Sequence, residues 1–539
     1  MEGVLVIAKR PSDEILTSVS TNAAGRYEFP RERMPPGIYT LSIRATGFEL
    51  PASHHVKPVT ISPKEPVERN LTIVAVSKPS TLAAQLTNLE WLNSFPGTSE
   101  QKDLMVRNIV NCGFCHSLER IAKSNHNADE FRAVIRRMAS YDSDHSSGER
   151  IQISQAQESG EGSHWWGRDF GPVADYLATV NLSGGKSGWV YPLQALPRPT
   201  GESTHAVVTV FPVPRQQSIV HDLDVDSKGN VWYGNTSWDY IGRLIPRAGE
   251  FSEWAAPNFL PPAASGLDRI VGVMDIQVDP DDNVWAAVGG TKLARFSPKS
   301  GTWKSWDVPV VWLNPFRSPV HDGQHSMWVT GITAPPTDDK WHESAFQLDL
   351  STDALSLGIP LFDDKPDAID PGHEHAYRYC YMMDQDKAGN FVCTDPIGSS
   401  LARADLASGQ SRLIPTPTPF AYPRRGYRDP QNRFWFSEFY ADKVGVLDLA
   451  TSLITEYAVG AKYISPYYAR PDKKGNIWVS SNGSDRLLRL DPASGQVTQY
   501  LMPVYYDARK IVVDLSAEKT TVWLANKNSG QLIRVEVPD

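Results

Sequence analysis

The chain has 539 residues, with 53 basic and 62 acidic side chains and a formal net charge of −9 at pH 7. A chain of this length divides into several domains. It has no basic tract, so it lacks the clustered cationic surface that nucleic-acid binding requires. No run of about 18 apolar residues occurs, so no membrane span is expected. Its 16 Trp and 41 Pro, set among short alternating segments, predict a mainly β multidomain protein.

Residues 1–75 are expected to form a small antiparallel β-sandwich. Three strand-like segments separated by turn residues support this interpretation, namely 4–8, 26–29 and 38–45. The sequence from 24 to 48, with its Ala-Gly-Arg-Tyr-Glu-Phe and Pro-Gly-Ile-Tyr-Thr-Leu runs, resembles the carboxypeptidase regulatory-like domain. The resemblance implies a transthyretin-like sandwich without a catalytic role.

A Cys-x-x-Cys-His motif follows at Cys112, Cys115 and His116, and it is typical of covalent c-type haem attachment. Two thiols at this spacing add to the two vinyl groups of a porphyrin, and the histidine that follows ligates the iron. A redox cysteine pair or half of a zinc site is the alternative. A zinc site would need a second ligand pair nearby, whereas the next cysteines are Cys380 and Cys393. The motif therefore predicts one covalently bound haem c.

Helical patterns surround this motif. They predict a helix from Ser99, as its cap, to Val110, a second over 128–141 capped by Asn127 with Glu130, and a third over 171–180. This order of helices about the motif, over residues 96–185, resembles a compact class I cytochrome c. The resemblance implies an all-α haem domain that transfers electrons.

Met138 is the expected sixth ligand of the haem iron. It shares a helix face with Phe131, Val134 and Ile135, and a thioether ligand favours a raised potential and a closed iron. Ligand methionines in such cytochromes commonly lie on loops, so three alternatives remain open, namely His126, His145 and Met105.

Haem c is attached outside the cytoplasm, so we expect a periplasmic or secreted protein. Residues Met1 to Val4 show no basic region, apolar segment or cleavage site of an export signal. The expectation is that the signal is missing from this sequence.

From residue 205 to 539 the chain repeats itself. An Asp-x-x-Gly-Asn-type turn followed by a short apolar strand recurs with seven anchor positions: Trp232, Trp285, Trp328, Val392, Trp435, Trp478 and Trp523. The steps between anchors are 53, 43, 64, 43, 43 and 45 residues. A period near 43 built from short strands predicts a seven-bladed β-propeller. The run 205–214 would supply the last strand of the final blade and close the ring, and each anchor would pack between blades.

The repeats resemble virginiamycin B lyase, in Gly-Asn-Val-Trp-Tyr at 229–233 and Phe-Trp-Phe-Ser-Glu at 434–438. That resemblance implies a metal-assisted lyase with histidines and a glutamate at the propeller mouth. His221 and Glu438 match these positions, and Mg²⁺ at the mouth is the metal that this activity would require. The segment His373-Glu374-His375 has suitable residue types but lies outside the blade pattern.

Counting eleven residues back from the anchors predicts the side chains around the mouth. These are His221, Met274, Arg317, Tyr381, Arg424 and Tyr467, with Arg425 and Lys510 beside them. Three residues beyond the anchors, the polar positions are Asn235, Asp395, Glu438 and Asn526. Arg317 and Arg424 are expected to hold an anionic or carbonyl-bearing ligand, and His221 and Glu438 to transfer protons or bind metal. Two alternatives remain open: the arginines pair with blade-turn aspartates, or they meet haem propionates.

Three functions remain open at this stage, in order of preference. The first is an electron-transfer protein or oxidoreductase whose propeller binds a small, anionic substrate or docks a redox partner, either a dehydrogenase or a cytochrome. The second is a lyase resembling virginiamycin B lyase, with an accessory haem. The third is a binding scaffold without catalysis. Fold resemblance alone does not decide among them.

The haem motif generates the first testable prediction. In protein matured with haem, the red chromophore should stay with the protein in acid acetone, because two thioether bonds hold it. Met138→Ala should convert the low-spin iron to high-spin and lower its potential. Extraction of haem into the organic phase would contradict the attachment. An unchanged spectrum of the variant would assign the sixth position to another ligand or leave it open.

Overall fold

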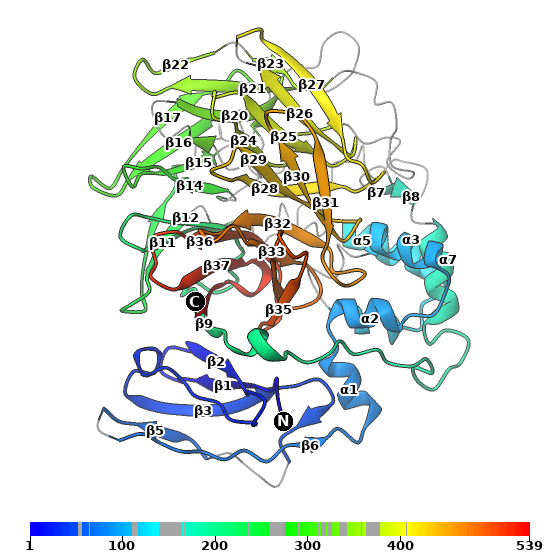
Figure 1. The fold of residues 1–539 in the computed structure, drawn as a ribbon. Helices are drawn as coiled ribbons and strands as arrows, with labels where there is room; N and C mark the ends of the chain where they lie inside the picture. The colour runs from blue at the N-terminus through cyan, green and yellow to red at the C-terminus, as the bar shows by residue number, and fades with distance from the viewer. Residues whose placement is uncertain are drawn as a thin grey trace.

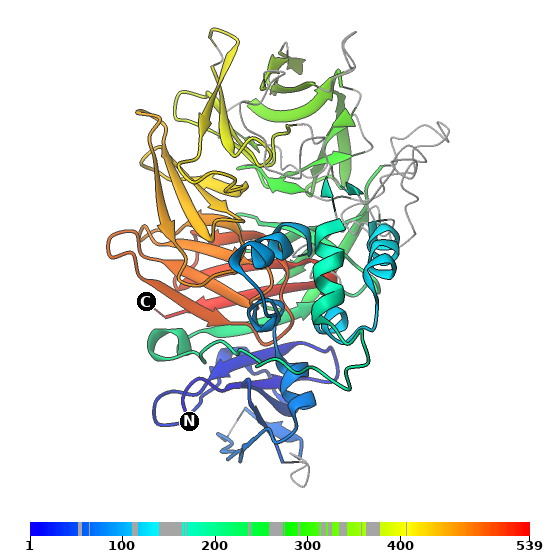
Figure 2. The same ribbon diagram turned by 90° about the vertical axis from the view of Figure 1, so that its right-hand side faces the viewer.

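A computed structural model gives the structure of this protein (Figure 1). The described residues are 1–51, 57–63, 65–109, 117–139, 164–165, 168–169, 171–235, 238, 240–257, 273, 275–288, 292–310, 312–313, 320–321, 326–333, 342–356, 358–362, 378–405 and 407–538. The part so described is mainly β, with short helices gathered at one side of the sheets (Figures 1 and 2).

The N-terminal region contributes one four-stranded sheet in the order β2-β1-β3-β5. Its strands are β1 (Leu5–Lys9), β2 (Leu16–Ser20), β3 (Gly37–Arg44) and β5 (Val59–Ile61). A separate two-stranded ladder pairs β4 (Phe48–Glu49) with β6 (Val74–Ala75). The expected strand at 26–29 is wrong, because this segment has no strand pairing and follows the turn in which Gly25 donates to the Asn22 carbonyl. The predicted sandwich and its family stay a prediction.

The helices lie between this sheet and the repeats in sequence. They are α1 (Pro79–Gln85), α2 (Asn88–Ser94), α3 (Ser99–Ile109), α4 (Glu119–Ala122), α5 (Ala128–Ala139) and α7 (Gly171–Val180), with a hairpin of β7 (His164–Trp165) and β8 (Arg168–Asp169) before α7. Of the helices in the described ranges, none has the length and apolar character needed to cross a bilayer.

The three helices predicted around the haem motif are present. The cap of α5 is as expected, because Asn127 and Glu130 exchange side-chain to backbone hydrogen bonds of 2.8 and 2.9 Å. The cap of α3 differs from the prediction. The cap is Thr98, one residue earlier than Ser99. Its hydroxyl oxygen accepts a hydrogen bond from the Gln101 backbone amide, and its own backbone amide donates to the Gln101 side chain. The cytochrome c family itself stays a prediction, since the motif lies outside the described residues.

The repeats form antiparallel sheets that follow one another along the chain. The first blade contains β10 (Val220–Val225), β11 (Val231–Asn235), β12 (Tyr240–Ile245) and β13 (Glu250–Ala255). The second contains β14 (Ile276–Val278), β15 (Val284–Val288), β16 (Lys292–Ser297) and β17 (Thr302–Asp307). The third contains β18 (Trp312–Leu313), β19 (Val320–His321), β20 (Ser326–Thr333), β21 (His342–Asp349), β22 (Ala354–Leu355) and β23 (Ile359–Pro360).

Three regular blades follow. They contain β24 (Met383–Gln385), β25 (Phe391–Asp395), β26 (Ser400–Asp405) and β27 (Gln410–Pro415), then β28 (Pro423–Arg428), β29 (Arg433–Glu438), β30 (Lys443–Asp448) and β31 (Ile454–Ala458), then β32 (Pro466–Pro471), β33 (Ile477–Ser481), β34 (Arg486–Leu490) and β35 (Val497–Leu501). Six anchor positions of the sequence repeat lie on the second strand of their blades, and Trp328 lies on β20, which pairs with both short strands β18 and β19.

The last blade closes the ring. It contains β36 (Ala508–Asp514), β37 (Thr520–Asn526) and β38 (Gln531–Val537), and its outer strand is β9 (Val207–Pro212) from the start of the propeller. The inner strand of this blade contacts that of the first, β36 against β10. The described residues therefore form a seven-bladed β-propeller closed as the sequence predicted.

Strand β9 also joins the propeller to the N-terminal region. Its other edge pairs antiparallel with β2, from Leu16 opposite Val210 to Val19 opposite Val207. One eight-stranded sheet therefore runs from the inner strand of blade seven to β5. Two ion pairs reinforce this junction, Arg33 with Glu536 and Arg44 with Asp485.

Aspartates of the blade turns bind the anchor tryptophans. The indole Nε1 atoms of Trp232, Trp285, Trp435 and Trp478 donate to aspartates six residues earlier at 2.8 to 3.0 Å. The same carboxylates accept backbone amides of their own turns. Each indole is buried against the next blade, as expected. The aspartate thus fixes both the turn and the tryptophan between blades.

This dual role predicts a large cost for Asp429→Ala. Asp429 is buried. The change removes its carboxylate, which accepts hydrogen bonds from the Trp435 indole, at 2.9 Å, and from the Arg433 amide. The free energy of unfolding should fall by about 2–4 kcal/mol, because a buried donor loses its partner. Urea denaturation measures it. The matched change Asp448→Ala removes a turn aspartate that accepts from the amides of Ala450 and Thr451 and holds no buried indole, and should cost about 1 kcal/mol or less. Equal losses would contradict this role.

Candidate functional site

The inner strands carry paired polar residues where they approach the propeller axis. The pairing register shifts between Val220 and Leu223 in β10, and similar irregularities occur in β28, β32 and β36. A bulge inserts one extra residue and re-aims side chains. Consecutive polar residues occupy three of these bulges: His221-Asp222, Arg424-Arg425 and Arg509-Lys510. All six side chains are buried.

His221 lies against two carboxylates. Its Nδ1 is 2.9 Å from Asp222 Oδ1 and 3.5 Å from Asp275 Oδ1. Burial, with the imidazole 1% exposed, lowers the pKa of His221 to about 4 despite these neighbours. The ring is therefore neutral at pH 7 and is a weak base.

Arg425 binds the same two carboxyl groups. Its Nη1 donates to both oxygens of Asp222 at 2.8 Å, and its Nη2 donates to those of Asp275 at 3.0 and 3.2 Å. Burial raises the pKa of Asp275 well above its ordinary value. Burial is also the largest influence on Asp222 and disfavours its ionisation, but the charge of Arg425 and the hydrogen bonds with Asp275 and His221 together outweigh it and lower that pKa. The pair thus shares a single negative charge, which balances Arg425.

A metal ion at this cluster would compete with that arginine. His221, Asp222 and Asp275 place one ligand atom each within 4.8 Å of one another, and no other such group occurs among the described residues. Arg425 already takes up both carboxyl groups, and the Lys510 ammonium lies 3.9 Å from Asp222. A divalent cation would have to displace the guanidinium. The predicted Mg²⁺ stays a prediction that this geometry does not favour.

Arg424, the predicted ligand-binding residue, lies in an aromatic box instead. Its guanidinium carbon is 3.8 Å from the centroid of Phe439, and 4.7, 5.2 and 5.4 Å from those of Tyr467, Tyr422 and Tyr381. Arginine pairing with blade-turn aspartates is therefore not what occurs at this position. It is the neighbouring Arg425 that pairs with aspartates, and these belong to the inner strand β10 and the residue before β14.

Glu438 is buried at the end of β29, and neither of its carboxyl oxygens meets the geometric criteria for a hydrogen bond with any described residue. Burial and the nearby Glu456 carboxylate raise the pKa of Glu438 to about 8. Its electrostatic neighbours are Glu456 and Lys443, whereas His221 interacts with Asp222 and Asp275. At pH 7 Glu438 is protonated, so it suits hydrogen-bond donation better than metal ligation.

The other polar positions predicted at the mouth serve internal contacts. Asn235 donates to Ser218, Asp395 accepts from Arg378, and Asn526 accepts from the Asp507 amide. Arg317 and Met274, as well as His373 to His375, lie outside the described residues. Cys380 and Cys393 are buried, and no disulfide joins them.

Cys112, Cys115 and His116, which the sequence predicts to bind haem, lie outside the described residues, as does the alternative ligand His145. Met138 lies in α5, but its side chain is outside the described part. Of the other candidates, Met105 is fully buried, and His126 is half-exposed beside Glu130.

Helix α3 packs on the aromatic box. The Tyr440 hydroxyl donates to the Arg107 carbonyl at 3.3 Å, and the Arg107 guanidinium lies 5.6 Å from the Phe420 centroid. The Tyr440 and Tyr422 rings are 4.5 Å apart. One continuous apolar cluster joins Met105 and Val106 of this helix to blades five and six. Helix α3 therefore packs on blade five, next to the aromatic box that holds Arg424.

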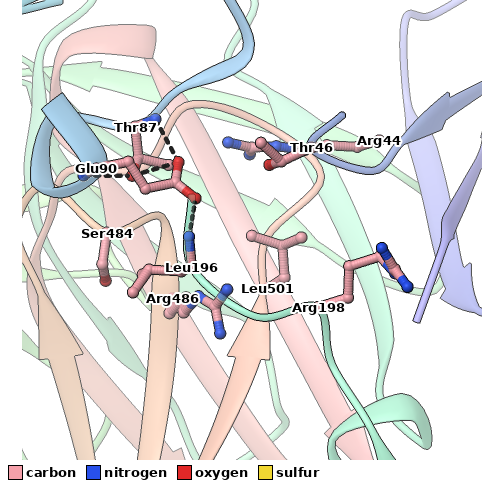
Figure 3. Close-up of a pocket in the computed structure, with 9 residues that line it drawn as sticks. All are labelled: Arg44, Thr46, Thr87, Glu90, Leu196, Arg198, Ser484, Arg486 and Leu501. Atoms are coloured by element: carbon pink, nitrogen blue, oxygen red, sulfur yellow. Dashed lines mark hydrogen bonds between the residues drawn. The ribbon is translucent and has the colours of Figure 1, made fainter. Parts of the chain in front are cut away.

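A small pocket lies at the junction of four segments (Figure 3). It is lined by Arg44 and Thr46 of the N-terminal region, Thr87 and Glu90 at α2, Leu196 and Arg198 of the linker, and Ser484, Arg486 and Leu501 of blade six. The Glu90 carboxylate accepts the Leu196 amide at 2.7 Å, and Arg486 donates to the Pro197 carbonyl at 2.6 Å. These contacts fasten the linker to its neighbours. None of the predicted site residues lines this pocket.

Comparisons with known proteins give fold neighbours only. No family model matches the chain, and no curated protein matches it. Similar solved structures include a streptogramin B lyase, with 17% identity, a TM-score of 0.49 and coverage of 62% of this chain and 99% of that one. Virginiamycin B lyase from Staphylococcus aureus has 18% identity, a TM-score of 0.44 and coverage of 61% and 99%. YCF48 bound to D1 peptide has 11% identity, a TM-score of 0.44 and coverage of 61% and 94%. Identities this low transfer no activity.

Sequence reasoning missed Asp222 and Asp275, and placed Arg425 only beside the mouth. The count of eleven residues from each anchor selects one residue per blade, whereas the bulges bring two consecutive residues to the axis. Polar pairs in otherwise apolar inner strands were the available signal, since His221-Asp222 and Arg424-Arg425 interrupt such strands.

The buried Glu438 predicts a pH-dependent stability. The unfolded carboxyl ionises near pH 4.5 and the folded one near 8, so over this interval the folded state holds a proton that the unfolded state has lost. Stability should therefore fall as the pH rises from about 4.5 to 8. Glu438→Gln should exceed the wild type in unfolding free energy at pH 8 by on the order of 2–4 kcal/mol, since one pKa unit is worth about 1.4 kcal/mol.

Urea denaturation at several pH values measures this difference, which should vanish near pH 4.5. Glu250→Gln, on the exposed outer strand β13, is the matched control and should show no such trend. A Glu438→Gln variant less stable than the wild type at pH 8 would contradict the buried, protonated state.

Proposed function

We propose that this chain is an exported c-type haem protein that transfers electrons, in a periplasm or at the cell exterior. Its propeller binds a small anionic substrate or docks a redox partner, a dehydrogenase or a cytochrome. The observation that carries the proposal is the packing of α3 on blade five. Two residues separate Ile109, the last of this helix, from Cys112. A haem held by the motif is thus tethered within about 11 Å of that helix end.

The described helices suit such a group. Helix α7 contacts both α3 and α5, and the apolar cluster of these helices includes buried Met105, Phe131, Ile135 and Leu177. Such an apolar environment is of the kind that surrounds haem. Cys112 and Cys115 would hold it, with His116 and Met138 as axial ligands. Bound there, it would supply one-electron redox chemistry. The cationic, aromatic face at Arg424 would orient an anionic partner beside it.

A lyase resembling virginiamycin B lyase is the second candidate. The cluster of His221, Asp222 and Asp275 could offer ligands to Mg²⁺. Against this, Arg425 takes up both carboxyl groups, and Glu438 is protonated near neutral pH. A non-catalytic binding scaffold is the third candidate, and in it the buried network at the axis is purely structural.

Redox titration of the haem-loaded protein tests the proposal. We expect a reversible one-electron titration, and faster reduction of the haem when a donor substrate or a dehydrogenase is added. Cys112→Ala/Cys115→Ala is the control and should show neither. Elimination activity that depends on Mg²⁺ and leaves the haem spectrum unchanged would favour the lyase. If the protein exchanges electrons neither with an added donor substrate nor with a partner protein, the result would favour the binding scaffold.

A further inference from the structure

Arg424 is buried without a hydrogen-bonding or ionic partner. Only 4% of the residue's surface is exposed, and its Nε atom is fully enclosed. No hydrogen bond or salt bridge joins its guanidinium to any described residue. A guanidinium carries five N–H donors in a rigid fork. Leaving them unpaired in a buried site costs free energy, since charged groups normally keep their partners when they leave water.

Aromatic faces keep this arginine charged. Four rings lie within 5.4 Å of the guanidinium carbon, those of Phe439, Tyr467, Tyr422 and Tyr381. Burial opposes the charge, but the neighbouring tyrosines favour it, and the pKa of Arg424 is raised above its ordinary value. The guanidinium lies over these rings in cation–π contacts. Such contacts do not supply an oxygen or nitrogen acceptor for its N–H donors.

The next residue in the chain shows what a structural arginine looks like here. Arg425 is equally buried, yet it donates to Asp222 and Asp275 through both Nη atoms. Its charge is balanced within the propeller. The charge of Arg424 is not balanced by any described carboxylate. The two arginines differ in this way although the same bulge of β28 positions both.

We propose that Arg424 is the receptor for a carboxylate, which binds its N–H edge at the seam between helix α3 and blade five. A planar carboxylate matches the fork of the guanidinium and would supply the missing negative charge. Two sources share this chemistry: a haem propionate, and the carboxylate of a small substrate. The first source rests on the proposed haem function, whereas the second does not.

The place of the box suits either source. Tyr422, one wall of the box, stacks near Tyr440, whose hydroxyl reaches the Arg107 carbonyl of α3. The ligand would therefore meet residues of both the helical region and the propeller.

Titration calorimetry with sodium benzoate, a carboxylate on a planar apolar body, tests the proposal on the full-length protein. Haem-loaded protein and the haem-free variant Cys112→Ala/Cys115→Ala are compared, each with Arg424, Arg424→Met or Arg424→Lys. Binding of benzoate should weaken at least tenfold in both Arg424 variants. Arg412→Met, at an exposed position of β27, is the matched control and should bind as the wild type does.

The two arms distinguish the sources. If a propionate occupies the site, benzoate binds only the haem-free protein, and Arg424→Met shifts the haem midpoint potential. If the site serves a substrate, both forms bind benzoate and the potential is unchanged. Protein that acquires no covalent haem would defeat the proposed function, and the benzoate arm would still decide the role of Arg424.

Thermal unfolding separates a receptor from a structural residue. Without ligand, Arg424→Met should unfold at the wild-type temperature or above it, because the change removes an uncompensated buried charge. If Arg424→Met does not fold, Arg424→Lys carries the test, since it keeps the charge and the cation–π contacts but loses the fork. No benzoate binding in either form, together with an unchanged haem potential in the Arg424 variants, would overturn the proposal.

Discussion

The position of β9 is the constraint on which the rest of the structure depends. This strand pairs with β38 on one edge and with β2 on the other. The first pairing closes the propeller with a strand from its own beginning. The second extends the same sheet into the N-terminal region, so ring closure and the attachment of that region share one strand. The two sets of backbone hydrogen bonds lie on opposite edges of β9, so the pairing with β38 that closes the ring also fixes the free strand edge on which β2 pairs.

Closure of the ring brings buried charges together at the axis. Asp222 and Arg425 are 203 positions apart in sequence, yet they form a bidentate pair. Such a network is costly to bury and is retained where each group has a partner. Arg425, Asp222 and Asp275 meet this condition, while Arg424 and Glu438 have no such partner in the part of the chain that the structure describes. The two exceptions lie on blade five, the blade on which helix α3 packs. Unsatisfied buried groups of this kind gather where a protein binds something else.

The helical region is continuous with the propeller in packing. One apolar cluster includes Leu89 and Trp91 of α2, Met105 of α3 and Trp435 and Tyr467 of blades five and six. A backbone bond from the Leu89 amide to the Gly483 carbonyl, at 2.7 Å, adds a direct link. The helices are thus held in a fixed place relative to Arg424. The electron transfer that we propose would need this kind of fixed geometry, because the orientation of the reacting groups is then set before they meet.

The sequence alone determined the number of blades, the strand that closes the ring and the helices at 99–109, 128–139 and 171–180. These features follow from local patterns: a turn aspartate six residues before a tryptophan, or an apolar period of one helix face. The sequence did not determine that β2 pairs with β9 in one sheet, since pairing between the edges of two sheets leaves no periodic pattern in the sequence. Nor did it determine which arginine is balanced. Arg424 and Arg425 differ because a bulge turns them differently and because the carboxylates of Asp222 and Asp275 arrive from distant blades. Charge balance in a buried site depends on such long-range neighbours, which only the tertiary structure brings together.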